Sequence, residues 1–172
     1  MSILESERLL FRQHELADLG AFCAMEADPE VRRYVGGAPR TREDAERKFR
    51  QVHLKRARSR LALRATIFKP EGCYIGYCGL YPNFMPGGAI ANEAALGLYL
   101  AREFWGRGLA TEAGRAFVSF GFHELRLARI VATVEAGNAA SLRVLEKLGF
   151  ARIGTESGPR CFHKFELSNP LA

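Results

Sequence analysis

Two glycines flank an arginine at the point where the hydrophobic pattern of the chain changes. An alternating apolar run over residues 94–100 predicts a strand, and apolar residues at helical spacing follow directly after Gly106, Arg107 and Gly108. The glycines therefore indicate a tight turn between a strand and the start of a helix. Such a turn presents unpaired backbone N–H groups at the positive end of a helix dipole, where a phosphate binds favourably.

The spacing of these glycines argues against two common nucleotide-binding motifs. The turn lacks the third glycine of a dinucleotide-binding fingerprint, and the sequence has no Gly-Lys pair followed by Ser or Thr, as a nucleoside triphosphatase would need. The identity of the phosphate must therefore come from the segments around the turn.

Four segments in and around the turn together resemble the GNAT superfamily of acyl-CoA-dependent N-acetyltransferases: Leu96–Leu100, Trp105–Ala113, Asn138–Ser141 and Glu146–Phe150. Within that superfamily the resemblance is closest to the RimJ/RimL-like branch, which acetylates the N-termini of ribosomal proteins. Two earlier segments, Glu7–Arg12 and Asp28–Gly36, also resemble this branch. The likeness thus covers nearly the whole chain.

The resemblance implies acetyl-coenzyme A as the cofactor. The backbone N–H groups of about Arg107–Thr111 would bind its pyrophosphate, because the glycines permit a close approach of the backbone. Its pantetheine arm would lie between two splayed parallel strands, at Leu98–Leu100 and residues 129–134, and a backbone N–H near Leu98 or Tyr99 would stabilise the oxyanion. The residues assigned to cofactor binding are Leu98, Tyr99, Leu100, Gly106, Arg107, Gly108, Leu109, Ala110, Thr111, Asn138 and Ser141.

The catalytic base is less clearly indicated. Family members often carry a glutamate two residues before the glycine that corresponds to Gly97, but this sequence has Ala95 there. Glu93 points to the same face if the strand is regular, so it is the base candidate. The alternative is a solvated carboxylate, since a bulge would change its direction. Ser141 could protonate the departing thiolate, with hydrogen bonding to the cofactor as the rival role.

The absence of a clearly placed catalytic base affects which amines the site could acetylate. An α-amino group has a pKa of about 7.7 to 8.0 and is partly neutral at cellular pH, whereas a lysine, near about 10.4, is almost wholly charged. We therefore expect direct acetyl transfer to a primary amine, in particular a protein or peptide N-terminal α-amine. The alternatives are a small-molecule amine, such as a polyamine, amino acid or aminoglycoside, and a non-catalytic acyl-CoA-binding sensor.

The remaining pattern predicts one α+β domain over residues 1–172, with a mixed sheet and about four helices. The resemblance adds that the sheet is mostly antiparallel, with splayed central parallel strands. The expected strands are 9–13, 61–67, 74–81, 94–100, 129–134, 151–155 and 161–167. The expected helices are 15–27, one from Thr41, one from residue 109 and one capped by Asn138. Residues 83–88 are expected to form a loop.

Several side chains carry more specific expectations. The helix from Thr41 should open with a capping box to Asp44 and bury Val52. By family analogy Tyr34, Tyr81 and Phe84 could line the acceptor pocket. The histidines show no metal-ligand spacing and are expected at the surface, so no metal is predicted. Their positions are His14, His53, His123 and His163, and the four scattered cysteines are expected to be free thiols.

The composition is typical of a folded globular protein. The 172 residues are 48% hydrophobic and 26% charged, and the formal net charge is +6. This positive charge could suit nucleic acid, but the basic residues do not gather on one predicted element, so no nucleic-acid partner is expected. No apolar run approaches the about 18 residues of a membrane helix, and the first residues do not resemble a secretory signal. We expect a cytoplasmic protein that is a monomer or homodimer.

Overall fold

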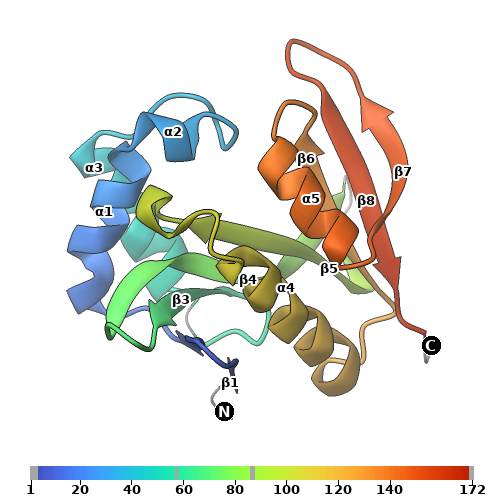
Figure 1. Ribbon diagram of the computed structural model, residues 1–172, viewed down its shortest axis with the longest axis horizontal. Helices are drawn as coiled ribbons and strands as arrows, with labels where there is room; N and C mark the ends of the chain where they lie inside the picture. Colours follow the sequence, from blue (N-terminus) through green and yellow to red (C-terminus); the bar gives the residue numbers. More distant parts are fainter. Residues whose placement is uncertain (1–3, 57, 86–87, 171–172) are drawn as a thin grey trace.

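A computed structural model of the protein describes residues 4–56, 58–85 and 88–170 and contains an eight-stranded sheet in the order β1-β2-β3-β4-β5-β6-β8-β7 (Figure 1). All neighbouring strands are antiparallel except β5 and β6, which are parallel. The strands are β1 (Leu4–Glu5), β2 (Leu9–Arg12), β3 (Leu63–Phe68), β4 (Cys73–Met85), β5 (Gly88–Leu100), β6 (Arg129–Glu135), β7 (Ala151–Glu156) and β8 (Phe162–Ser168).

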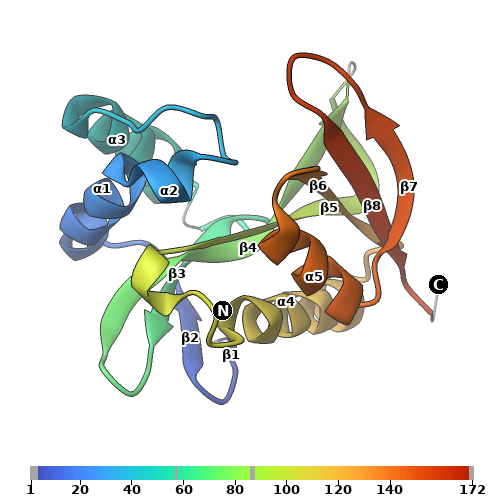
Figure 2. The same cartoon turned by 45° about the horizontal axis from the view of Figure 1, so that its top comes forward.

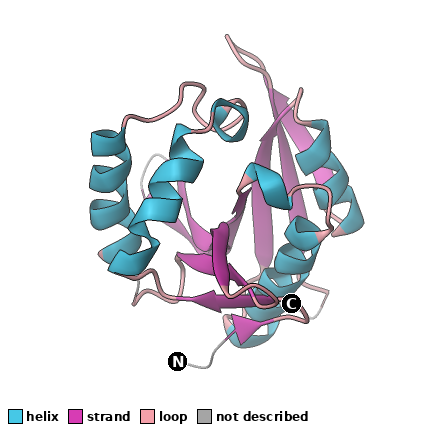
Figure 3. Ribbon diagram, turned by 60° about the vertical axis from the view of Figure 1, so that its left-hand side comes forward, coloured by secondary structure: helices cyan, strands magenta, loops and turns pink. Residues whose placement is uncertain are grey.

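Helices flank the strands on both sides (Figure 3). The α-helices are α1 (Leu19–Ala27), α2 (Pro29–Arg32), α3 (Arg42–Lys48), α4 (Leu109–Ser119) and α5 (Ala139–Lys147). Shorter helical turns are η1 (Leu16–Asp18), η2 (Phe49–Leu54), η3 (Arg102–Phe104) and η4 (Phe120–Glu124). This arrangement confirms the predicted α+β fold with its splayed parallel pair, and adds α2 to the four expected helices.

The alternation of β5 divides the apolar residues between two cores. Leu96 and Leu100 belong to one cluster, in which α4 packs through Leu109 and Phe117. Tyr99, on the opposite face of the strand, packs against the second cluster, which is formed with α1, α3 and η2. Figure 2 shows the two helical groups on separate sides of the central strands, α1–α3 in one and α4–α5 in the other.

Two helix starts follow from their capping residues. The hydroxyl of Thr41 accepts the backbone N–H of Asp44 at 3.2 Å, which confirms the predicted cap of α3. Asp28 accepts the N–H of Glu30 at 2.8 Å and places Pro29 in the first turn of α2. The expected loop at residues 83–88 is shorter than predicted, because β4 extends through residue 85; Pro86 and Gly87 lie outside the described residues.

The burial expected in the segment after α3 was wrong at two positions. Val52 is 38% exposed, whereas His53, expected at the surface, is 3% exposed. The cause is the π-helical geometry of η2, because its wider turn rotates the side chains relative to a regular α-helix. His14 is also buried rather than on the surface, at 4% exposed, and its ring contacts that of His53.

The strand β5 is irregular near its start. Pro82 on β4 pairs with Ala94, but Phe84 pairs with Ala89, so one residue of β4 lies opposite four residues of β5. Asn92 within this stretch has a positive φ of 56°, which is uncommon outside glycine. A bulge therefore interrupts the regular alternation just before the central part of the strand.

Candidate active site

A cavity opens where the two parallel strands separate. β5 and β6 pair from Glu93↔Arg129 to Ala95↔Val131, and no ladder pair between them follows in the described chain. The facing backbone groups of the later residues are thereby available to an extended ligand. The described residues that line the cavity are Tyr34, Val35, Tyr81, Leu96, Gly97, Leu98, Tyr99, Ala110, Ala132, Thr133, Val134, Glu135, Asn138, Ser141, Val144, Leu145 and Phe162.

Both glycines of the turn adopt a backbone conformation that leaves the N–H groups at the start of α4 open to a phosphate. We call this turn and the first turn of α4 the phosphate seat. Gly106 and Gly108 have φ values of 74° and 78°, in the left-handed region that favours glycine. Gly108 is the N-cap of α4, and the first bond along the helix runs from the N–H of Glu112 to its carbonyl at 3.1 Å. The N–H groups before Glu112 in this first turn thus have no acceptor within the helix.

The first turn of α5 faces the same cavity. Asn138 accepts the N–H of Ser141 at 3.1 Å through its side-chain oxygen and so caps the helix. Both residues line the cavity, together with Ala110 from α4 and Leu98 and Tyr99 from β5. The structure therefore brings together five of the residues assigned to the cofactor.

The other assigned residues lie outside the lining of this cavity. The side chains of Leu100, Leu109 and Thr111 are buried, so only their backbone can contact a ligand. Gly106, Arg107 and Gly108 lie exposed on the turn immediately before the cavity-lining Ala110.

Glu93 is not brought to the cavity. It lies in the bulged part of β5, is 4% exposed, and forms an ion pair with Arg129 on β6. Asn83 on β4 donates a hydrogen bond to its other carboxylate oxygen. The register with β6 is unbroken from Glu93 to Ala95, so the bulge does not reverse the direction of this side chain. Its carboxylate is instead held by Arg129 and Asn83 outside the cavity lining, and this placement supports a structural role.

Glu135 is the carboxylate that the sequence did not single out. Among the described residues that line the cavity it is the only acidic side chain, and Arg160 engages it through both Nε, at 3.1 Å from Oε1, and a terminal nitrogen. Arg160 also donates to the backbone carbonyl of Arg33 at 2.9 Å. These partners are far apart in sequence, so no local pattern could have revealed them.

Two tyrosines supply neutral hydrogen-bonding groups. Tyr81 and Tyr99 line the cavity, and both rings lie close to Gly97. Burial raises the pKa of both phenols, so both stay protonated near neutral pH. Tyr34 also lines the cavity, as expected by analogy, whereas the side chain of Phe84 lies outside the described residues.

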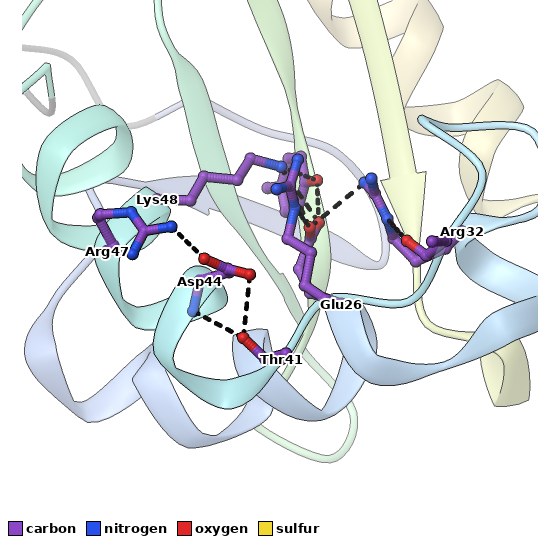
Figure 4. Close-up of polar contacts among 9 residues, drawn as sticks. Glu26, Arg32, Thr41, Asp44, Arg47 and Lys48 are labelled. Carbon is purple, nitrogen blue, oxygen red and sulfur yellow. Dashed lines mark hydrogen bonds and ion pairs between the residues drawn. The ribbon is translucent and has the colours of Figure 1, made fainter.

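A buried carboxylate holds the helices beside the cavity (Figure 4). Glu26 of α1 is 1% exposed, and it accepts hydrogen bonds from Arg40 at 2.7 Å and from Tyr77 at 2.6 Å. Arg32 and Lys48 each approach it to 3.3 Å. Burial raises the pKa of Glu26, but Lys48, Tyr77 and Arg32 outweigh this and lower it overall. We call α1–α3 and their connecting residues the helical wall.

Within the described residues, no group of three or more His, Cys, Asp or Glu side chains could hold a metal ion. The four cysteines are free thiols. None of the helices in the described part of the chain combines the length and apolar character needed to cross a membrane.

A parallel pair that splays beside a glycine turn and a helix N-terminus defines an acyl-CoA-dependent transferase. The chain belongs to the GNAT family, because the family described as Acetyltransferase (GNAT) domain matches residues 8–151. It is therefore an N-acetyltransferase that uses acetyl-coenzyme A.

Comparisons with related sequences and solved structures agree with this family assignment. The chain is 33% identical over 158 residues to the uncharacterised N-acetyltransferase p20 of Bacillus licheniformis, covering 90% of this chain and 85% of the relative. A GNAT-family acetyltransferase from Bacillus anthracis superposes with a TM-score of 0.84 at 24% identity, covering 98% and 99% of the two chains. RimL, a ribosomal alpha-N-protein acetyltransferase solved with coenzyme A, gives a TM-score of 0.80 at 15% identity, covering 97% and 98%.

Proposed function

We propose that the enzyme transfers the acetyl group of acetyl-coenzyme A directly to the α-amine at the N-terminus of a protein or peptide. The observation that carries this proposal is the pairing of Glu135 with Arg160. No other acidic side chain is among the described residues that line the cavity, and this one is already engaged by a cation. Such a site favours an amine that loses its proton easily.

The difference between amines is large enough to decide the acceptor. At neutral pH roughly a tenth to a fifth of an α-amine with a pKa of about 7.7 to 8.0 is neutral, but only about a thousandth of a lysine amine is. A strong base would be needed to overcome this difference for lysine. Glu135, or a water molecule beside it, needs only to remove the proton that the α-amine loses during attack.

The cofactor is proposed to span both strands of the splayed pair. The N–H groups of residues 107–111 bind the pyrophosphate, and the free edge of Leu98–Leu100 binds the pantetheine amides. A backbone N–H near Leu98 or Tyr99 stabilises the carbonyl oxygen under attack. Ser141 donates a hydrogen bond to the departing sulfur, while Asn138 holds the helix that carries it.

Matched peptides test the acceptor. One peptide carries a free N-terminus and no lysine, and its partner carries a formylated N-terminus and one lysine. With labelled acetyl-coenzyme A we expect label on the free N-terminus and none on the formylated peptide. The rate should rise with pH up to the pKa of the α-amine.

Other outcomes point to specific alternatives. Label on the lysine of the formylated peptide would contradict an α-amine acceptor. Turnover confined to polyamines, amino acids or aminoglycosides would indicate a small-molecule acetyltransferase. Stabilisation by acetyl-coenzyme A without turnover on any amine would indicate an acyl-CoA sensor.

A further inference from the structure

Arg8 lies against the glycine turn although the two are about a hundred residues apart in sequence. Its Nε donates to Glu112 in the first part of α4 at 2.8 Å, and a terminal nitrogen lies 2.7 Å from the same carboxylate oxygen. Its other terminal nitrogen donates to the backbone carbonyl of Arg107 at 3.1 Å. The guanidinium therefore joins the turn to the first part of α4.

The position of Gly108 shows how close this cation comes to the phosphate seat. A Cβ atom built on Gly108 would lie 3.7 Å from a terminal nitrogen of Arg8, which is ordinary van der Waals contact. The guanidinium thus lies beside the N-cap residue of α4, where the N–H groups of the first helical turn are exposed to a ligand.

A positively charged side chain at the N-terminal end of α4 calls for an explanation. A cation beside the N-terminus of a helix is disfavoured by the dipole unless an anion is nearby. Glu112 supplies one negative charge. Burial raises its pKa, but the backbone N–H of Arg8, the hydroxyl of Ser6 and the Arg8 guanidinium outweigh this and lower it. A bound phosphate would bring further negative charge to the same place.

The geometry of Arg8 leaves it able to bind that phosphate. Each terminal nitrogen carries two hydrogens, and the described chain offers each nitrogen one partner. The side chain is 38% exposed, so the remaining hydrogens can be reached by a ligand. We propose that Arg8 is a cofactor-binding residue whose remaining N–H groups contact the coenzyme A pyrophosphate, while Glu112 and the Arg107 carbonyl hold it in place.

This inference rests on the proposed seat of the cofactor at the glycine turn and is tested by binding alone. Isothermal titration of the full chain compares coenzyme A with dephospho-coenzyme A, which keeps the pyrophosphate and lacks the 3′-phosphate. Arg8→Ala should weaken both ligands by about tenfold, because one charge-assisted contact is lost. Arg8→Lys should lie between, because an ammonium keeps the charge without the planar fork.

Substitutions at Glu112 separate direct contact from support of the turn. Glu112→Gln should weaken coenzyme A binding less than Arg8→Ala does, because the amide oxygen can still accept from Arg8. Arg8→Ala combined with Glu112→Gln should be no tighter than Arg8→Ala alone. If Glu112→Gln alone weakens binding as much as Arg8→Ala, Arg8 only supports the turn. If the double variant regains parental affinity, Arg8 only neutralises Glu112. Thermal unfolding of each variant checks that the chain is folded.

Two further results would overturn the proposal. One is an unchanged affinity in Arg8→Ala. The other is a loss seen with coenzyme A but absent with dephospho-coenzyme A, which would move the contact to the 3′-phosphate. Failure of the seat itself would appear separately, as unchanged binding in Gly108→Ala. Failure of the proposed acceptor cannot affect these titrations, since they contain no amine substrate.

Discussion

The cofactor side of the cavity is shaped by backbone conformation, whereas the helical wall is held by side-chain charges. On the cofactor side, two glycines with positive φ and two helix N-termini supply the polar groups. In the helical wall, one buried carboxylate gathers two arginines, one lysine and a tyrosine. The first arrangement depends on local spacing, and the second on residues that meet only after the chain has folded.

The largest effect is expected in the helical wall. Among the described residues, Glu26 is the only carboxylate that pairs with Arg32 or Lys48, so Glu26→Gln leaves the buried Arg32 and the half-buried Lys48 without a counter-charge. Breaking a buried ion pair in this way costs about 3 to 5 kcal/mol of unfolding free energy. Urea unfolding measures this loss.

A matched substitution sharpens this test. Glu30 is 44% exposed and lies 3.8 Å from Arg33, so Glu30→Gln should change the unfolding free energy by less than about 0.5 kcal/mol. Folded Glu26→Gln should show a raised KM for the acceptor and an unchanged Kd for coenzyme A. An equal loss of affinity for both substrates would show that the two sides are not separable.

The second largest effect is expected from acid, which should lower the free energy of unfolding through two histidines packed beside the helical wall. The rings of His14 and His53 lie 4.6 Å apart, and none of their nitrogens has a hydrogen-bond partner among the described residues. Burial lowers the pKa of His14 to about 4 and that of His53 to about 2. The charged groups that act on them are Arg12, Asp18, Lys48 and Arg64.

Because the pKa values of both histidines are lowered in the folded chain, the free energy of unfolding should fall as the pH is lowered. At neutral pH both rings are neutral in the folded and unfolded chain, so stability is not affected. Below the unfolded pKa of about 6.5 the unfolded chain binds protons that the folded chain excludes, and stability falls. From about pH 7 to pH 5.5 the two histidines together should cost about 2.5 kcal/mol.

Urea midpoints across this pH range measure the loss. His53→Phe should remove about half of the acid dependence, since His14 still titrates in the unfolded chain. Val52→Ala provides the control, because Val52 is the neighbouring residue, is 38% exposed and carries no titratable group, so the acid dependence should be unchanged. An identical pH profile in His53→Phe would contradict the assignment.

On the cofactor side, Gly108→Ala should act mainly on binding. The positive φ of 78° costs an alanine about 1 to 2 kcal/mol, and relaxation of the turn would misalign the N–H groups. We expect the Kd for coenzyme A to rise at least about tenfold. Gly20→Ala is the control, because Gly20 lies in α1 with open space around it and should be neutral or slightly stabilising.

The smallest effect is expected at Ser141. Its hydroxyl is a weak acid, and a thiol with a pKa near about 8.5 leaves readily as a thiolate. Ser141→Ala should therefore lower kcat by less than about tenfold. Turnover at saturating acetyl-coenzyme A measures this value. No change in kcat, with a raised KM for the cofactor, would leave Ser141 as a binding residue only.

The comparison also explains what could be predicted from the sequence. Helix caps at Thr41 and Asn138 and the turn at Gly108 depend on neighbours within a few residues, and the structure has the predicted caps and turn. Glu93 was chosen as the base candidate because alternation places it on the same face as Gly97, but its carboxylate is held by Arg129 and Asn83. These partners lie on other strands, so spacing within one strand cannot reveal them.

Polar contacts between residues remote in sequence could not be predicted from the sequence either. Glu26 meets Tyr77 across 51 residues, and Arg8 meets Glu112 across 104. An arginine-rich chain offers many possible partners for each carboxylate, so the correct pairing is decided only by the fold. Most of the residues that hold the helical wall in place form such pairs between residues remote in sequence.

The order of the sheet has a consequence for synthesis of the protein. β8, the last strand, lies between β6 and β7 and forms the antiparallel border of β6 from Arg129 to Glu135. Until Ser168 has left the ribosome, β6 lacks this border, and the cavity wall that includes Glu135 cannot be held in register. The cofactor turn can form before β8 is made, but the complete cleft requires β8 to pair with β6, through non-local contacts that are slow to form.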